Sequence, residues 1–137
     1  MAETWVYHYT PESKQQSKQW KQPDEPTPKK AKAILSAGKV MASVFCDARG
    51  VIMVDYLSKD QTINSTYFCT LLRRLGEEIK KKRSGLLRQK VLFHQDNARV
   101  HTSVESMAQI RDCGFELLPH PAYSPDLAPS DFHLLLF

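Results

Sequence analysis

Runs of apolar and β-branched residues predict strands in the first half of the chain. Residues 4–9 are rich in aromatic and β-branched side chains, which fit the pleated surface of a strand. Residues 39–46 and 51–57 are two more runs of this kind, and the short connection between them contains Asp47 and Gly50. Because such turn residues join antiparallel strands, the pattern predicts a first strand and, later, a hairpin.

The apolar spacing becomes helical from about residue 64 onwards. Apolar side chains then recur three and four positions apart, at Tyr67, Phe68, Leu71, Leu72, Leu75 and Ile79. This spacing places them on one face of a helix. Glu78 and Lys82 form an acid–base pair at i,i+4 spacing on the outer side. Gly85 is the expected end of this helix.

A strand, a helix and a second strand follow in immediate succession. Residues 90–95 form the first strand, and Thr102 with Glu105 has the spacing of a capping box that opens a helix. The side chains expected to point inward from this helix are Val104, Met107, Ala108 and Ile110. Gly114 is the expected cap, and residues 115–118 form the last strand. A βαβ unit has parallel strands, so the sequence predicts a parallel pair here.

Together these elements predict an α/β fold with a mixed sheet of about five strands flanked by helices. In sheets of this kind, ligands gather at the carboxyl ends of the parallel strands. Asp96 lies at such an end, directly after the strand of residues 90–95. Asp96 is therefore the first candidate for chemistry.

Composition limits the class of protein. The chain has 137 residues, of which 42% are hydrophobic and 25% charged, which suits one domain over residues 1–137. Its longest apolar runs are far shorter than the roughly 18 residues of a membrane span, so we expect no membrane association. The first residues have neither a basic region nor an apolar one, so we expect no secretory signal. The formal net charge of +4 is compatible with a polyanionic partner.

Proline and cysteine placement add two expectations. All eight prolines lie within residues 11–28 and 119–129, so regular structure is expected between these stretches. Residues 10–37 show neither helical nor strand periodicity and are expected to form a long arm. The three cysteines are an odd number without a C-x-x-C pair, which predicts free thiols.

Two blocks of sequence resemble the signatures of a known family. The stretches are FHQDNARVH at residues 93–101 and HPAYSPDLAPSDFH at residues 120–133. Both resemble the signature blocks of mariner-family transposases. The resemblance also covers residues 3–13 and 39–45, so it extends through nearly the whole chain.

The resemblance implies an RNase H-like fold in which three aspartates bind divalent metal and catalyse the cutting and joining of DNA ends. Asp96 and Asp131 have the spacing that the family shows between its second and third aspartates. They are therefore the expected catalytic and metal-binding residues, with Mg²⁺ or Mn²⁺ as cofactor. Hard Mg²⁺ prefers carboxylate oxygen, and paired ions activate the attacking oxygen and stabilise the leaving one.

The first aspartate of the family is missing here, because its position is occupied by Ala2. Side chains alternate between the two faces of a strand, so Glu3 is expected to point away from the site and not to replace that aspartate. Asp47 and Asp55 match no catalytic position and are expected to be turn and surface carboxylates.

Further expectations follow from the resemblance. Asn97, Arg99 and His101 are expected to shape the site around Asp96. The arm of residues 10–37, which contains Trp20, corresponds to a clamp that reaches the partner subunit, so a homodimer is possible. DNA is the expected partner and the nucleus the expected location. The helix-turn-helix region that precedes the core in the family, and the helix that follows it, are expected to be absent.

Each of these residues also has a plainer interpretation. Asp131 could be a carboxylate at a helix N-terminus, and Asp96 could be a turn residue. A zinc site formed by His94, Asp96 and His101 is disfavoured, because His101 lies beyond a loop. Two functions stay open: an active transposase core, or a transposon-derived module that binds nucleic acid or dimerises without catalysis. The replacement at Ala2 favours impaired catalysis.

Overall fold

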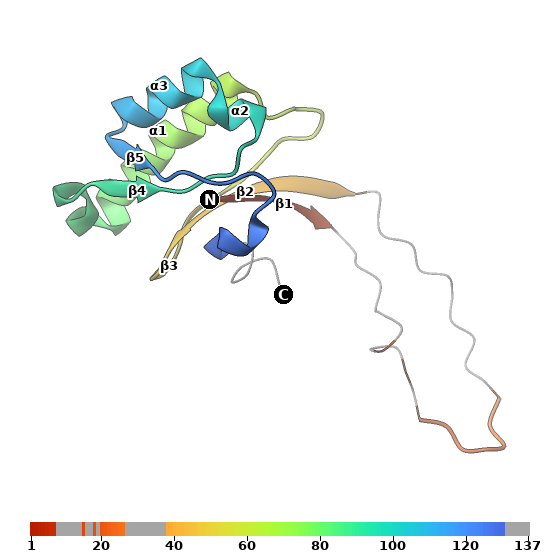
Figure 1. Cartoon of the computed structure of the whole chain (residues 1–137). Coiled ribbons are helices and arrows are strands. Elements are labelled where there is room, and N and C mark those ends of the chain that lie inside the picture. The colour runs from red at the N-terminus through yellow and green to blue at the C-terminus, as the bar shows by residue number, and fades with distance from the viewer. Residues whose placement is uncertain (8–14, 16–17, 19, 27–37, 131–137) are drawn as a thin grey trace.

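The computed structural model describes residues 1–7, 15, 18, 20–26 and 38–130. Asp131 and most of the predicted arm therefore lie outside the described residues. Figure 1 shows the helices α1, α2 and α3 on one side of β1 and β2, and the short C-terminal 3₁₀ helix η2 (Pro125–Leu127) on the other side.

The first three strands form an antiparallel sheet in the order β1-β2-β3. These strands are β1 (Ala2–Tyr7), β2 (Lys39–Asp47) and β3 (Gly50–Tyr56). The turn between β2 and β3 is closed by the amide of Arg49, which donates a hydrogen bond of 2.8 Å to Oδ1 of Asp47. The predicted hairpin is confirmed.

The last two strands form a separate parallel pair. They are β4 (Val91–Phe93) and β5 (Phe115–Leu117), and α3 (Val104–Asp112) lies between them in the chain. The predicted βαβ unit is therefore confirmed. The expected single sheet of about five strands is instead two adjoining sheets. The two sheets meet where the amino nitrogen of Met1 donates to the carbonyl of His94, the residue after β4, at 3.1 Å. One hydrogen bond of this kind is too few to form a strand ladder.

The long helix α1 (Ser65–Lys82) begins and ends at well-defined caps. Oδ1 of Asn64 accepts a hydrogen bond of 2.8 Å from the amide of Tyr67, which satisfies one of the free donors of the first turn. The helix ends at Lys82, and Gly85 lies inside the following 3₁₀ helix η1 (Ser84–Arg88). The predicted stop at Gly85 was therefore a few residues too late.

The capping box predicted for α3 is wrong. The N-cap is Ser103, whose Oγ accepts a hydrogen bond of 3.2 Å from the amide of Ser106. Thr102 instead ends the short helix α2 (Arg99–Thr102). Of the side chains expected to point inward, Ile110 is buried and Met107 packs against the core, whereas Val104 and Ala108 are exposed. The buried face of α3 is the one that packs against α1 and β5. It also includes Ser106, whose buried hydroxyl has hydrogen-bond partners.

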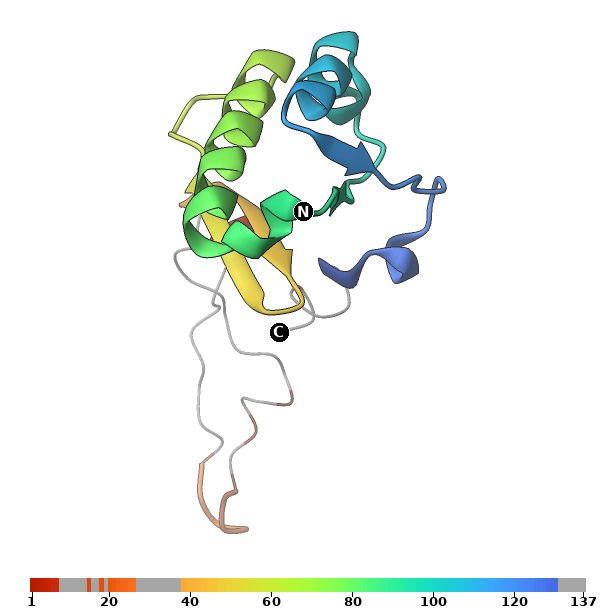
Figure 2. The same ribbon diagram turned by 90° about the vertical axis from the view of Figure 1, so that its left-hand side faces the viewer.

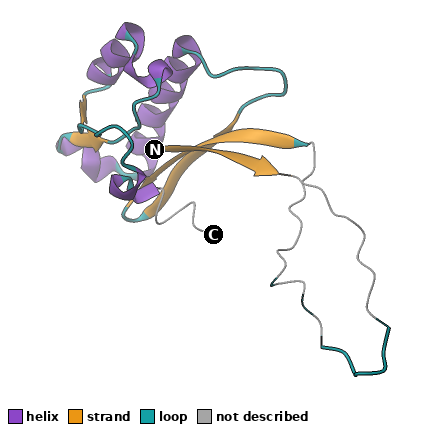
Figure 3. Cartoon of the chain, turned by 45° about the vertical axis from the view of Figure 1, so that its right-hand side comes forward, coloured by secondary structure: helices purple, strands orange, loops and turns teal. Residues whose placement is uncertain are grey.

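The core lies between α1 and the two sheets (Figure 2). Phe93 links the sheets, since its ring lies 6.4 Å from that of Phe45 in β2 and 5.7 Å from that of Phe115 in β5. Figure 3 shows how the helices gather on one face of the strands. The three cysteines are free, as predicted.

Asp55 was expected to be a surface carboxylate, and this expectation is wrong. Its side chain is only 11% exposed. It accepts a hydrogen bond from the hydroxyl of Tyr67 and pairs with Arg74, both on α1. Burial, together with the adjacent Asp55 carboxylate, raises the pKa of Tyr67 to about 12. These contacts fix α1 above β3. Asp47 is a turn residue as expected, and it also pairs with Arg83 at 2.8 Å.

Candidate functional site

Asp96 lies in the loop between β4 and α2, and its side chain is 65% exposed. Its Oδ1 accepts a hydrogen bond of 3.1 Å from the amide of Ala98, which is the geometry of a local Asx turn. The same oxygen lies 2.6 Å from Nδ1 of His101. The carboxylate is therefore held in place from one side while the rest of it faces outward.

His101 is the most buried polar group of this site, with 1% of its surface exposed. It lies in α2, and its ring packs at 4.5 Å from that of Phe68 in α1. Its Nε2 lies 3.0 Å from Oε1 of Glu3 in β1. Both ring nitrogens thus face carboxylates that come from distant parts of the chain.

Electrostatics favour the charged form of this histidine. Burial opposes the imidazolium charge, but the hydrogen bonds with Asp96 and Glu3 outweigh it and raise the pKa of His101 to about 9. At neutral pH both ring nitrogens therefore donate. In turn, the hydrogen bond from His101 holds the pKa of Asp96 below its ordinary value. As a result, the imidazolium of His101 lies between two carboxylates, those of Asp96 and Glu3.

Glu3 lies on the opposite face of β1 from Ala2, as expected, but it still takes part in the surroundings of Asp96 through a third residue. Alternation along β1 does separate Glu3 from Ala2, but the face that Glu3 shares with Trp5 is the one covered by the helices. His101 lies on that face, so Glu3 reaches Asp96 through it. Sequence reasoning missed this contact because it depends on where α2 packs against the sheet.

Ala2 is 8% exposed and pairs with Val44 of β2. Its neighbour Met1 contacts both signature blocks. The amino nitrogen of Met1 donates to the carbonyl of His94, and the carbonyl of Met1 accepts a hydrogen bond of 3.3 Å from Oγ of Ser130. Position 2 therefore directly follows Met1, which is hydrogen-bonded to His94, two residues before Asp96, and to Ser130, the residue before Asp131.

Two further contacts join the signature blocks. Nδ2 of Asn97 donates to the carbonyl of His120 at 2.7 Å, and Nε2 of His94 lies 3.0 Å from Nδ1 of His120. Arg99 is exposed at the start of α2. Trp20 is fully exposed and is not part of this site.

Gln95 is a site residue that sequence reasoning did not single out. It is 3% exposed, and its Nε2 donates a hydrogen bond of 3.1 Å to the carbonyl of His101. Its Oε1 has no hydrogen-bond partner within the described part of the chain. The signal in the sequence was a polar residue at the end of the predicted strand of residues 90–95, directly before Asp96.

A divalent metal ion needs several ligand atoms that converge on one point. Residues 1–7, 15, 18, 20–26 and 38–130 contain no group of three or more His, Cys, Asp or Glu side chains that could hold an ion. Asp96 offers one outward carboxylate, and one of its oxygens is engaged by a cationic imidazole. By themselves these residues do not fit Mg²⁺ or Mn²⁺. No helix of the described chain is long and apolar enough to cross a membrane.

The strand order, the parallel βαβ unit and Asp96 after its first strand define the class as an RNase H-like fold. A family model for "Transposase (partial DDE domain)" matches residues 10–89. The chain therefore belongs to the transposase family, and its relatives place it in the mariner branch.

The relatives cover nearly all of this chain. The chain is 34% identical over 134 residues to the Mariner Mos1 transposase of Drosophila mauritiana, which is 96% of this chain and 38% of that protein. It is 31% identical over 134 residues to the human histone-lysine N-methyltransferase SETMAR, again 96% of this chain but 19% of that protein. The chain thus spans less than half the length of either relative.

Solved structures agree with these sequence matches. The Mos1 mariner paired end complex with Mn aligns with a TM-score of 0.85 and 34% identity, over 98% of this chain and 38% of that one. The Mos1 transposase catalytic domain with Raltegravir and Mg aligns with a TM-score of 0.68 and 37% identity, over 71% of this chain and 49% of that one. The expected family and fold class are confirmed.

Proposed function

We propose that this chain is a DNA-transposition core in which metal-dependent strand cleavage is impaired, because Ala2 occupies the position of the first catalytic aspartate. One observation carries the proposal. Met1, next to Ala2, is hydrogen-bonded both to His94 and to Ser130, which lie close to Asp96 and directly before Asp131. A carboxylate at position 2 would therefore be near the other two candidate positions.

Asp96 and Asp131 are the residues proposed to hold Mg²⁺ or Mn²⁺. Relatives of this chain have been solved with Mg and with Mn. Divalent ions held there would activate the attacking oxygen and stabilise the leaving oxygen of a phosphodiester. With two carboxylates in place of three, the ion would be held weakly, since groups that act as a unit are not individually dispensable.

The neighbouring residues are proposed to prepare Asp96 for this role. The imidazolium of His101 holds one carboxylate oxygen, and Glu3 holds the imidazolium from behind. Asn97 fixes the loop against the second signature block. Arg99 is exposed close to Asp96 and is suited to contact a phosphate of bound DNA.

DNA is the proposed partner and the nucleus the proposed place of action. The related structures include a paired-end complex with a left transposon end. The exposed Trp20 supports a second proposal, that the arm of residues 10–37 contacts a second copy of the chain. The alternative function is dimerisation or DNA binding without cleavage. The presence of Ala2 in place of the first aspartate favours this alternative.

Cleavage can be tested by Mn²⁺-dependent nicking of supercoiled plasmid. The proteins to compare are the unmodified chain, Asp96→Ala, Ala2→Asp, and the double variant Ala2→Asp with Asp96→Ala. The two variants without Asp96 control for contaminating nuclease. We expect little nicking by the unmodified chain and a gain of at least about tenfold in Ala2→Asp that the double variant loses.

Two other outcomes would contradict parts of the proposal. Nicking by the unmodified chain that disappears in Asp96→Ala would show that the site is complete without an aspartate at position 2. Absence of nicking from both the unmodified chain and a folded Ala2→Asp would show that the missing carboxylate is not what limits catalysis. DNA binding measured in parallel, by fluorescence anisotropy of a labelled duplex, separates a non-catalytic binding module from a chain that does not engage DNA.

A further inference from the structure

Two histidine rings face each other beside the candidate site, and the proposed function does not use them. Nε2 of His94 lies 3.0 Å from Nδ1 of His120. The ring centroids are 4.9 Å apart, and the ring planes meet at 67°. His94 directly follows β4, and His120 is the third residue after β5. We call these two residues the histidine pair.

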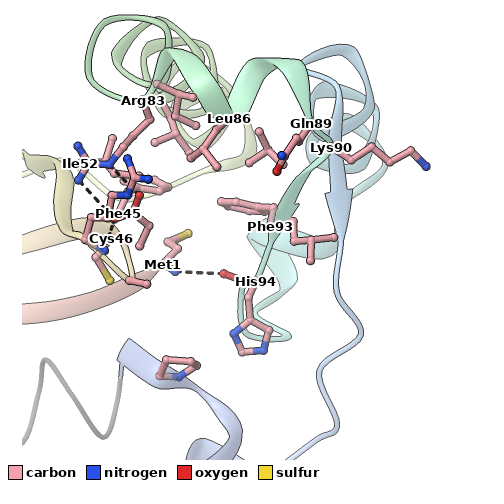
Figure 4. Close-up of a pocket in the computed structure, with 18 of the residues that line it drawn as sticks. Met1, Phe45, Cys46, Ile52, Arg83, Leu86, Gln89, Lys90, Phe93 and His94 are labelled. Carbon is pink, nitrogen blue, oxygen red and sulfur yellow. Dashed lines mark hydrogen bonds and ion pairs between the residues drawn. The ribbon is translucent and has the colours of Figure 1, made fainter.

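The backbone holds the histidine pair in position. β4 and β5 are hydrogen-bonded as parallel neighbours, so their carboxyl ends lie side by side. Nδ2 of Asn97 donates a hydrogen bond of 2.7 Å to the carbonyl of His120, which fixes the segment after β5 against the loop after β4. Figure 4 shows the ring of His94 pointing away from Leu86, which packs against the core. Both histidines are half-buried. The pair is therefore fixed by its surroundings and still reached by solvent.

The spacing of the two ring nitrogens suits a shared metal ion. Imidazole nitrogen lies about 2.0–2.1 Å from a bound Zn²⁺. Two nitrogens 3.0 Å apart subtend an angle of about 94° at an ion held at such distances. This angle is close to the right angle of octahedral and tetragonal sites, and a further separation of about 0.3 Å gives the tetrahedral angle. A tilt of the two rings thus directs both lone pairs at one point.

The ligand type selects the class of ion. Neutral imidazole suits Zn²⁺, Ni²⁺ and Cu²⁺, whereas Mg²⁺ prefers oxygen ligands. Within the described chain no third His, Cys, Asp or Glu side chain completes a group that could hold an ion, so water supplies the remaining ligands. His120 also lines a cavity of about 260 Å³, together with Asp96, Asn97 and Thr102. This cavity offers room and polar partners for metal-bound water.

We propose that the histidine pair binds a first-row transition ion of the Zn²⁺ class through Nε2 of His94 and Nδ1 of His120. The proton that one of these nitrogens donates in the free pair moves to the other nitrogen of the same ring, so both lone pairs become available to the ion. The bound ion ties the segment after β5 to the end of β4. This site differs in ligands and in ion from the proposed carboxylate site, and it does not depend on the proposed function.

The first test is titration of the full chain with Zn²⁺ at neutral pH, followed by isothermal calorimetry and by NMR of the histidine rings. With two ligands in place of the four of a structural zinc site, we expect a Kd on the order of 10 μM. The ring nitrogen signals of His94 and His120 should shift together. His101, whose ring nitrogens face Asp96 and Glu3, serves as an internal control and should keep its signals.

Matched variants test the ligands. We expect His94→Asn and His120→Asn each to weaken Zn²⁺ binding at least about tenfold, since each removes one of two protein ligands. Cys46→Ser and Cys113→Ser remove the half-buried thiols, which are the competing soft ligands, and should leave the affinity within about twofold. Circular dichroism establishes that the variants fold. A hundredfold excess of Mg²⁺ should not displace the Zn²⁺.

Three results would overturn the proposal. The first is absence of saturable Zn²⁺ binding at millimolar ion, which would leave the histidine pair as a hydrogen bond between two loops. The second is binding that shifts ring signals other than those of His94 and His120. The third is binding that both His→Asn variants retain and Asp96→Ala loses, which would assign the ion to the carboxylate site.

The outcome is separate from that of the nicking assay. Zn²⁺ binding is measured without DNA and without turnover, so a chain that neither binds nor cleaves DNA can still confirm the histidine pair as a metal site. Conversely, nicking that depends on Asp96 can occur in a chain that binds no Zn²⁺.

Discussion

Nδ1 of His101 lies 2.6 Å from Oδ1 of Asp96, so a histidine that is 1% exposed is joined to a carboxylate that is 65% exposed. The two residues belong to the same signature block, and the short turn at Ala98 brings them together. The partner on the other side of His101 is Glu3, from the opposite end of the chain. The candidate site is therefore built on three charged side chains, with the buried His101 in the middle, that link β1, α2 and the loop after β4.

The first prediction concerns the charge on His101. Glu3→Gln removes one of the two carboxylates that stabilise the imidazolium, while burial still opposes it. We expect the pKa of His101 to fall from about 9 towards its ordinary value near 6.5. Titration of the ring by NMR measures this shift. Glu25→Gln, on an exposed residue remote from His101, is the matched control and should leave it unchanged. An unaltered titration in Glu3→Gln would contradict the contact.

The second prediction is the pH dependence of stability. A folded pKa above the unfolded one stabilises the protein at pH values below the unfolded pKa, and this stabilisation is lost as pH rises through the folded pKa. For His101 the stabilisation is complete below about pH 6.5 and is lost on passing about pH 9. Its upper limit is on the order of 3 kcal/mol.

Urea unfolding at pH values between 6 and 10 measures this loss. His101→Asn keeps a polar side chain without a titrating group in this range, so its stability should vary less with pH than that of the unmodified chain. Equal slopes for the two proteins would show that His101 is not charged in the folded state.

At acidic pH, the lowered pKa of Asp96 predicts a loss of stability as pH falls below about 4, through the folded pKa of this carboxyl.

The third prediction concerns the buried carboxylate under α1. Tyr67→Phe removes the hydroxyl that donates to Asp55 and leaves that carboxylate with Arg74 as its remaining side-chain partner among the described residues. We expect the free energy of unfolding to fall by about 1–3 kcal/mol. Tyr56→Phe, at a position 61% exposed on β3, is the matched control and should change it by less than about 0.5 kcal/mol. Similar losses in both would indicate that the Asp55 contact contributes little.

The fourth prediction separates packing from association. Phe68 is fully buried in the core, and Phe68→Ala should lower the free energy of unfolding by about 3–5 kcal/mol. Trp20 is fully exposed, so Trp20→Ala should leave the thermal midpoint of the monomer unchanged. If the arm contacts a second copy, Trp20→Ala should weaken self-association in sedimentation velocity. Unchanged self-association would remove Trp20 from the proposed dimer contact.

Local elements were predictable where a local interaction determines them. The hairpin at Asp47 and the N-terminus of α1 at Asn64 both depend on hydrogen bonds within a few residues, and both were predicted close to their observed positions. The start of α3 was misplaced because Ser103 and Thr102 are both good caps, and the packing of α2 decides between them. Asp55 was misjudged because its burial depends on α1, which is distant in sequence from β3.

The sequence by itself determined the family and the order of the strands and helices, because signature blocks and apolar periodicity are properties of residues that lie close together in the chain. It also placed Asp96 at the end of a parallel strand, since that position follows from the βαβ pattern. Only the tertiary structure decided that Glu3 joins Asp96 through His101 and that the strands divide into two sheets. These features depend on how distant segments pack, and packing is set by the shapes and partners that each side chain meets after the chain has folded.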